Sequence, residues 1–336
     1  MLNWQYRYES RYLPRRPGTE RIRLARCLVL PSSMYNTVSM LERLTTEQLN
    51  PESSHLDELS TVNLLEIMNA ADAQVALAVA QEIPRIAAAI QAIVDALESG
   101  GSLLYIGAGT SGRLGVLDAA ECPPTFGVPA GLVRGIMAGG ERALTHAVEG
   151  VEDDPAAGAH DLEASGFGPG DVLVGISASG RTPYVLGAVA KAHEINGLTC
   201  GISCVRDSEL SRAAQYPIEP VPGPEILTGS TRLRAGTATK LVLNMISTAV
   251  MVKLGHVYGN LMVNVQPTNR KLEDRARRII QAATGVSYDR ATELLDLAGR
   301  SVRVAIIMQQ KQISREKAES LLTAAKGRIR EALALG

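Results

Sequence analysis

The feature that most constrains the fold is a pattern that occurs twice: a short apolar strand, a loop rich in Gly and Ser, and then a helix. The first strand, 103–106, leads into the loop 107–113, and the second, 171–176, leads into the loop 177–182. We expect further strands at 132–137, 198–204 and 216–221. Alternating strands and helices with Gly-rich strand exits predict an α/β fold with a doubly wound parallel sheet. Ligands in such sheets bind beyond the carboxyl ends of the strands.

Helical patterns flank this region and suggest the domain organisation. Ser60 or Thr61 can cap a first helix, and a second is expected over 71–97. Strand signals stop after residue 267, so residues 41–268 are predicted to form the α/β domain with its N-terminal helices. Further helices complete a small C-terminal helical domain at 269–336; they are expected at 269–283, 288–297 and 317–335.

The N-terminal segment differs from the rest of the chain. Its first 33 residues contain seven Arg against two Glu, the only Trp, and neither helical nor strand periodicity. We interpret residues 1–40 as a flexible or mis-assigned N-terminal extension, ahead of a start at Met34 or Met40. A transit peptide is the alternative, because Arg is plentiful and acids are few.

Composition excludes several classes of protein. The 34 basic and 35 acidic residues nearly cancel, which gives no field favouring nucleic acid or an anionic membrane. An apolar content of 46% excludes a disordered chain. The four cysteines form no C-x-x-C pair, which favours reduced thiols in the cytoplasm and argues against zinc. Lys240, Asn244 and Lys253 interrupt the longest apolar stretch, 235–254, so no membrane span is expected.

The two loops carry the chemistry that the sequence suggests. Each contains Ser-Gly-Arg, at 111–113 and at 179–181, between a strand end and a helix start. Helix N-termini offer free N–H groups, Gly lets the backbone approach an anion, and hydroxyls add donors. This combination suits a phosphate monoester. The predicted phosphate-binding residues are Gly109, Thr110, Ser111, Ser177, Ser179, Gly180 and Thr182.

Two other interpretations of the loops remain open at this point. Gly107, Gly109 and Gly112 spell G-x-G-x-x-G, the dinucleotide fingerprint. That site would need an acid closing the second strand, which instead ends in Gly139-Gly140. Both loops could also be tight turns alone, although two turns do not require so many hydroxyls.

Two glutamates are candidates for proton transfer. Glu121 precedes Pro123-Pro124, which we expect to end a helix and to place this carboxyl in a desolvated site near the cleft. Glu152 lies in a cluster of acids, a pattern more typical of a solvated helix cap. Further possible polar contacts, with roles left open, are His146, Glu225, Arg232 and Arg234.

Several motifs together resemble the N-acetylmuramic acid 6-phosphate etherases, a branch of the sugar isomerase (SIS) domain superfamily. The resemblance extends from about residue 41 to the end, and its motifs lie at 105–115, 121–125, 147–153, 179–184 and 228–237. It implies a cytoplasmic carbon–oxygen lyase of cell-wall recycling that releases D-lactate from N-acetylmuramic acid 6-phosphate and leaves N-acetylglucosamine 6-phosphate. It also implies a homodimer without metal or organic cofactor. Glu121 matches the family's catalytic acid and Glu152 its second catalytic glutamate.

Competing classes share part of these motifs. Glucokinase regulatory proteins share the stretch 223–237 and bind sugar phosphates without transforming them, but they resemble two such domains in tandem. A phosphosugar isomerase would use the same loops and has no need of the segment 121–124. A SIS-type transcription regulator would need a basic helix-turn-helix module, and the Arg-rich N-terminal segment lacks helical periodicity.

Overall fold

The structure is a computed structural model in which residues 44–335 are described. The expected N-terminal extension, residues 1–40, lies outside the described residues.

The centre of the molecule is a five-stranded sheet in which every neighbouring pair is parallel, in the order β2-β1-β3-β4-β5. The strands are β1 (Leu103–Gly107), β2 (Val133–Met137), β3 (Val172–Ile176), β4 (Leu198–Ile202) and β5 (Tyr216–Ile218). All residues of β1 and β3 are buried, as expected for strands covered on both faces. The predicted α/β class with a doubly wound parallel sheet is confirmed.

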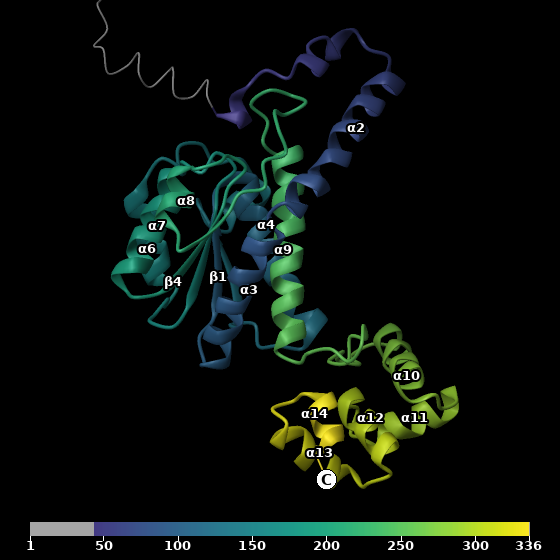
Figure 1. Cartoon of the computed structure of the whole chain (residues 1–336). Helices are drawn as coiled ribbons and strands as arrows, with labels where there is room; N and C mark the ends of the chain where they lie inside the picture. Colours follow the sequence, from purple (N-terminus) through teal and green to yellow (C-terminus); the bar gives the residue numbers. More distant parts are fainter. Residues whose placement is uncertain (1–43, 336) are drawn as a thin grey trace, which may run out of the picture. The chain divides into compact units, whose positions relative to one another are not determined.

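Helices cover both faces of the sheet (Figure 1). On one face lie α3 (Ile83–Glu98), α4 (Gly109–Phe126) and α9 (Arg234–Lys253), which share one apolar core with the sheet. A second core lies on the other face, under α6 (Pro155–Ala164), α7 (Pro183–Glu194) and α8 (Glu209–Ala213). The short helix α5 (Arg142–Thr145) follows β2.

The N-terminal helices differ from their expected bounds. Helix α2 (Thr61–Ala80) begins at the predicted cap, where Ser60 Oγ accepts a hydrogen bond from Asn63 N at 3.3 Å. The expected helix 71–97 is wrong, because α2 ends at Ala80 and α3 starts at Ile83. Pro84 explains the break, since its ring has no N–H to donate to the carbonyl four residues earlier. Three short 3-10 helices precede α2: η1 (Thr45–Glu47), η2 (Pro51–Ser53) and η3 (Leu56–Glu58).

The C-terminal helices enclose an apolar core of their own, to which Val263 and Val265 also contribute. They are α10 (Arg270–Thr284), α11 (Tyr288–Leu297), α12 (Val302–Lys311), α13 (Arg315–Ala324) and α14 (Ile329–Ala334). Helix α12 was not expected, because its Val and Ile residues have low helix propensity. The segment 317–335 holds parts of two helices, and Gly327 between them has φ 81°. The division into domains stays a prediction.

Two helices of the described part, α2 and α9, are long and apolar enough to cross a membrane by length and composition alone, although the sequence analysis expected no such segment. Helix α9 is a core helix, and more than half of its apolar window is buried. Helix α2 differs, since only 17% of its window is buried. Its apolar side chains Val62, Leu65 and Leu77 are exposed.

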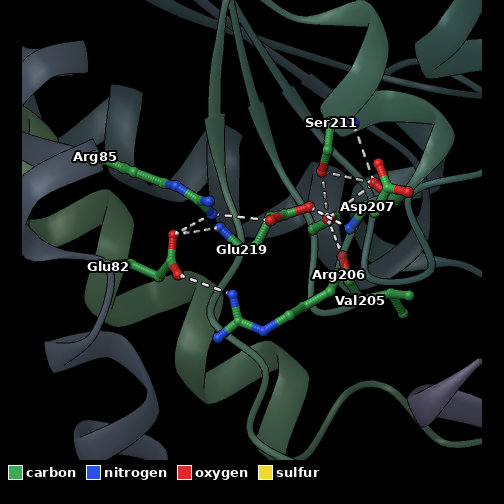
Figure 2. Close-up of polar contacts among 9 residues, drawn as sticks. Glu82, Arg85, Val205, Arg206, Asp207, Ser211 and Glu219 are labelled. Atoms are coloured by element: carbon green, nitrogen blue, oxygen red, sulfur yellow. Dashed lines mark hydrogen bonds and ion pairs between the residues drawn. The ribbon is translucent and has the colours of Figure 1, made fainter.

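A polar network attaches the start of α3 to the end of β5 (Figure 2). Two buried carboxylates, Glu82 and Glu219, lie on either side of Arg85. Arg85 donates to Glu219 at 2.8 Å and to Glu82 at 3.2 Å. Glu82 also accepts from the backbone N of Glu219 at 3.0 Å, and Glu219 accepts from the backbone N of Asp207 at 2.5 Å. The network therefore fixes the edge of the sheet to the helical layer.

Candidate active site

The two Ser-Gly-Arg loops lie at neighbouring strand ends. Strands β1 and β3 pair directly, with Gly107 opposite Ile176. From β1 the chain proceeds to β2 on one side of it, and β3 lies on the other side. This reversal of strand order is the point at which open α/β sheets bind ligands. The structure thus brings together the two loops that the sequence singled out.

The first loop delivers an uncapped helix N-terminus. Ala108, the N-cap residue of α4, makes no side-chain cap hydrogen bond. Gly109 has φ +53° and is exposed, while Thr110 and Ser111 are half-buried. Gly112 is needed for close packing, because a methyl group there would lie 2.6 Å from the carbonyl oxygen of Gly107. The first turn of α4 therefore offers N–H groups and two hydroxyls beside the end of β1.

Arg113 organises the segment that follows β2. Its Nε donates to the carbonyl of Leu144 at 3.2 Å, and its Nη2 donates to the carbonyl of His146 at 3.1 Å. The side chain of His146 is exposed and its Nδ1 lies 2.8 Å from the hydroxyl of Thr145. Arg113 thus positions the loop that follows β2.

Glu152 lies next to the first loop. A cavity of about 160 Å³ is lined by both Gly109 and Glu152, together with Arg113 and Glu149. The side chain of Glu152 is exposed, and its backbone carbonyl accepts from the N of Tyr184 at 3.0 Å. Because Tyr184 lies in the first turn of α7, this bond fixes Glu152 between the two loops.

The second loop holds a cluster of hydroxyls. Ser177 is buried, and its Oγ lies 2.8 Å from Oγ1 of Thr182 and 3.5 Å from Oγ of Ser179. Thr182, the N-cap residue of α7, makes no side-chain cap hydrogen bond to that helix. Ser179 and Thr182 are half-buried, so their hydroxyls lie near the surface beside a second helix N-terminus. Such an arrangement can hold an anion with neutral donors.

Gly180 and Arg181 serve the packing of this loop. Gly180 has φ +66°, and a methyl group there would lie 2.3 Å from Oγ of Ser208. Arg181 forms an ion pair with Glu209 at 3.0 Å. Sequence reasoning missed that the arginines of both Ser-Gly-Arg motifs have protein partners. In both motifs the Arg directly follows the Gly, which suggests a common structural role. The sequence could not identify the partners, because they lie far away in the chain.

Glu121 lies far along α4 from the first loop. It is twelve residues after Gly109, which corresponds to about 18 Å along the helix axis. Its side chain is exposed, so the expected desolvation is absent in the single chain. The expected helix stop at Pro123 is also wrong, because α4 continues to Phe126 and is capped by Gly127. Prolines near a helix end remove hydrogen bonds of the last turn only.

Glu225 is placed under the N-terminus of α9. It is buried, and its two carboxylate oxygens accept from the backbone N of Arg234 and of Ala235, each at 2.9 Å. Burial raises the pKa of this carboxyl, and the two N–H donors oppose the shift. Arg234 is buried and donates to the carbonyl of Pro224 at 2.8 Å, whereas Arg232 is exposed. Glu225 therefore caps α9 with both of its oxygens.

A buried carboxyl that the sequence analysis missed lies between α4 and α9. Asp118 accepts from the hydroxyl of Ser247 at 3.2 Å and lies 3.8 Å from Nζ of Lys240. Burial raises its pKa. Cys122, one turn further, is also buried, and burial raises the pKa of its thiol to about 12, so this thiol is no nucleophile. The sequence could have indicated this buried carboxyl, because Asp118 lies on the apolar face of the helix that follows the first loop.

Within residues 44–335, no group of three or more His, Cys, Asp or Glu side chains is placed to hold a metal ion.

One family model and several solved structures are similar to part of this chain. Residues 85–193 match the family model described as glucokinase regulatory protein N-terminal SIS domain. Among solved structures, a phosphoheptose isomerase from Neisseria gonorrhoeae is 18% identical and has a TM-score of 0.42, covering 57% of this chain and 99% of that chain.

Curated relatives match over nearly their whole length. An N-acetylmuramic acid 6-phosphate etherase of Pectobacterium atrosepticum is 53% identical, covering 87% of this chain and 97% of the relative. The etherase of Exiguobacterium sp. is 52% identical over 88% of this chain and all of the relative. That of Caldanaerobacter subterraneus is 50% identical over 88% of this chain and 96% of the relative. On this identity over so much of both sequences, the chain belongs to the N-acetylmuramic acid 6-phosphate etherase family.

Proposed function

We propose that this chain cleaves the D-lactyl ether of N-acetylmuramic acid 6-phosphate, giving N-acetylglucosamine 6-phosphate and D-lactate. The observation that carries the proposal is identity of about half of all positions with etherases over almost their full length. The site supports it, because two helix N-termini and a cluster of hydroxyls at the switch point suit a sugar phosphate.

The phosphate is bound by the two loops in this proposal. Thr110 and Ser111 would donate from the first turn of α4, and Ser179 and Thr182 from the second loop. A methyl group on Gly236 would lie 3.6 Å from Cγ2 of Thr110, so α9 also borders this end of the sheet. Both arginines have protein partners, and Arg113 also lines the cavity beside Gly109 and Glu152. The binding energy of the phosphate would position C2 and C3 of the open-chain sugar.

The chemistry requires one base and one acid. The aldehyde acidifies the C2 proton, and the lactyl ether on C3 is a β-leaving group. We assign the base to Glu152, which is exposed beside the first loop. We assign the acid to Glu121, because an alkoxide leaves poorly unless its oxygen is protonated. Lactate departs after C2 loses its proton, and water then adds at C3 of the unsaturated aldehyde. The chain's own residues suffice for these steps, so we propose no cofactor.

Release of D-lactate from the pure sugar phosphate tests the function directly. Turnover is expected without added metal or cofactor. Binding of the sugar phosphate without lactate release would instead favour a regulatory binding module, the class suggested by the glucokinase regulatory protein match. Isomerisation without lactate release would favour a phosphosugar isomerase.

The two glutamates can be separated by hydrogen exchange at C2, followed by proton NMR in deuterium oxide. Glu121→Gln is expected to stop lactate release and still allow exchange of the C2 hydrogen. Glu152→Gln is expected to depress both processes. Exchange lost in the Glu121 variant and kept in the Glu152 variant would reverse the roles. Full lactate release by both variants would remove these residues from the mechanism.

We further propose that the enzyme is a cytoplasmic homodimer. A groove of about 600 Å³ between α3 and α9 is lined by apolar side chains that include Ile83, Ile90, Met245 and Val252. Ile83, Met245 and Val252 are exposed apolar side chains in this groove, and a cluster of this kind favours a protein partner. Cys122, Cys200 and Cys204 are free and buried, which agrees with a reducing compartment.

The division at residue 268 into an α/β domain and a helical domain is also a proposal. It is supported by the separate apolar core that α10–α14 enclose.

A further inference from the structure

The backbone of the second loop is held on one side by the chain that follows β4. The backbone N of Cys204 donates to the carbonyl of Ala178 at 2.9 Å, and the backbone N of Leu210 donates to the carbonyl of Gly180 at 2.9 Å. These two bonds tie the support segment (residues 203–211) to the loop that is proposed to hold the phosphate. The position of the loop's donors therefore depends on the support segment.

Three buried serines of the support segment pack against Gly180. They are Ser203, Ser208 and Ser211. A methyl group on Gly180 would lie 2.3 Å from Cβ of Ser208 and 3.1 Å from Cβ of Ser203, so no space separates the serines from the loop. Ser208 Oγ donates to Ser203 Oγ at 3.0 Å and lies 2.8 Å from Ser211 Oγ. Because a close-packed interior transmits displacements, a shift of these serines moves Gly180.

Glu219 fixes the support segment from its other side (Figure 2). Its buried carboxylate accepts from the backbone N of Asp207 at 2.5 Å and from Arg85 at 2.8 Å. The same carboxylate accepts a hydrogen bond from Ser211. Asp207 has φ 49°, in the left-handed region that a residue other than glycine occupies only where its surroundings hold it. One carboxylate therefore connects α3, this turn and the buried serines.

We propose that Glu219 is a positioning residue for the phosphate of the substrate. It holds the turn at Asp207 and, through the three serines, sets where the second loop presents the hydroxyls of Ser179 and Thr182. The inference rests on the proposed function, in which those hydroxyls hold the phosphate. Glu219 is only 6% exposed, so it acts through the loop. Hydrogen bonds weaken steeply when their geometry is disturbed, so release of the turn lowers phosphate affinity and leaves proton transfer at C2 and C3 unchanged.

Steady-state kinetics of lactate release separate positioning from stability. Glu219→Ala is expected to raise KM about 10-fold and the inhibition constant of inorganic phosphate by a similar factor, with kcat within about 2-fold of the wild type. This pattern indicates lost binding that is equal in the ground state and the transition state. Circular dichroism at the assay temperature verifies that the variant is folded. Unchanged KM and an unchanged phosphate inhibition constant in the folded variant would overturn the inference.

Asp171→Ala is the matched control. Asp171 also joins two segments with one carboxylate, since it accepts from the backbone N of Ser102 at 2.6 Å and of Gly168 at 2.9 Å. It directly precedes β3 and so lies at the opposite end of this strand from the second loop. Its removal is expected to lower the free energy of unfolding and to change KM by less than about 2-fold. An equal rise in KM for both variants would show a general loss of rigidity and would refute the positioning role.

Double variants test whether the effect passes through the second loop. Ser179→Ala removes a proposed phosphate donor of this loop, and Ser111→Ala removes one of the first loop. Combined with Ser111→Ala, Glu219→Ala is expected to multiply the two rises in KM. Combined with Ser179→Ala, it is expected to give less than the product, because the misplaced donor is already absent. Full multiplication in both combinations would contradict a route through the second loop.

Glu219→Gln provides the same test if the alanine variant does not fold. It keeps the volume of the side chain but has one oxygen in place of two, so Asp207 and Arg85 cannot both keep their acceptor. A rise in KM of at least about 3-fold is expected, and an unchanged KM would overturn the inference. Failure of the proposed function looks different, since the wild type would then release no lactate.

Discussion

At the residue scale, the hydroxyls of the second loop have different roles, one within the loop and one at its surface. Ser177 is buried and holds the loop together through Thr182, whereas Ser179 is half-buried at the loop surface. The Gly and Ser pattern was sufficient to predict where these residues lie, because loop geometry is set locally. It was not sufficient to predict the partners of Arg113, Arg181 and Glu225, which come from elsewhere in the chain.

Ser179→Ala is expected to weaken substrate binding through one lost charge-assisted hydrogen bond. The loss is about 1.5–3 kcal/mol, or a rise in KM of roughly 10- to 150-fold. Steady-state kinetics measure the change, and Ser99→Ala, at the far end of α3, is the matched control. If inorganic phosphate and sugar 6-phosphates fail to compete with the substrate, the loops do not hold the phosphate.

Glu225→Gln is expected to destabilise the fold, because the amide NH₂ would face a backbone N–H of α9 in place of a carboxylate oxygen. The expected loss in the free energy of unfolding is about 1–3 kcal/mol, measured by urea denaturation. Glu319→Gln, in an exposed ion pair with Arg315, serves as the control and is expected to change stability by less than about 1 kcal/mol. Equal effects of the two substitutions would contradict the capping role.

At the scale of elements, the helices and strands expected from local sequence patterns differ from those in the structure where tertiary packing or a proline decides the outcome. The apolar pattern located β1 and β3 to within one residue at each end, since strands buried on both faces are continuous apolar runs. Prolines have different effects in two helices: Pro84 separates α2 from α3, whereas Pro123 and Pro124, which were expected to end a helix, are accommodated in the last turns of α4. Helix α12 was missed because its β-branched residues are held in a helix by the core around them.

Glu219→Gln tests the network between α3 and β5 through its pH dependence. Burial alone would raise the pKa of Glu219, but hydrogen bonds from Ser211, Asp207 and Arg85 together lower it. A lowered pKa in the folded state adds stability above the unfolded pKa of about 4.3, and this stability is lost as the pH falls through the folded value. At pH 7 the variant is expected to lose about 1–3 kcal/mol in urea denaturation.

The difference in stability between the Glu219→Gln variant and the wild type should shrink as the pH falls below about 4.3, because protonation of this carboxyl in the unfolded wild-type chain then favours the unfolded state. A difference that does not change from pH 7 to pH 3 would show that the charge of Glu219 contributes nothing.

At the scale of the whole molecule, the described part of one chain leaves two features unexplained. Helix α2 is apolar and mostly exposed, and the groove between α3 and α9 has no covering segment within residues 44–335. The position of Glu121 adds a third, because its carboxyl is distant from the cavity at Glu152. Sequence patterns could place the sheet and both loops, but a partner surface has no local signature that distinguishes it from a core face.

Met245→Glu is expected to shift the protein toward the monomer, because Met245 is 38% exposed and lines the groove. A charge in a desolvated interface is strongly unfavourable. Light scattering should report half the wild-type mass at low protein concentration, and lactate release should fall with it. Leu297→Glu changes an exposed residue on α11 and should leave the mass unaltered. Wild-type mass for the Met245 variant would exclude this groove from the interface.

The measurement that tests the account most directly is the fate of the oxygen of water during turnover. Elimination followed by addition breaks the bond between C3 and the ether oxygen, so lactate keeps that oxygen and water supplies the new hydroxyl on C3. In water enriched in ¹⁸O, mass spectrometry should find one labelled atom in N-acetylglucosamine 6-phosphate and none in lactate. Label in lactate would mean that water attacks the lactyl carbon, and the proton-transfer roles given to Glu121 and Glu152 would be wrong.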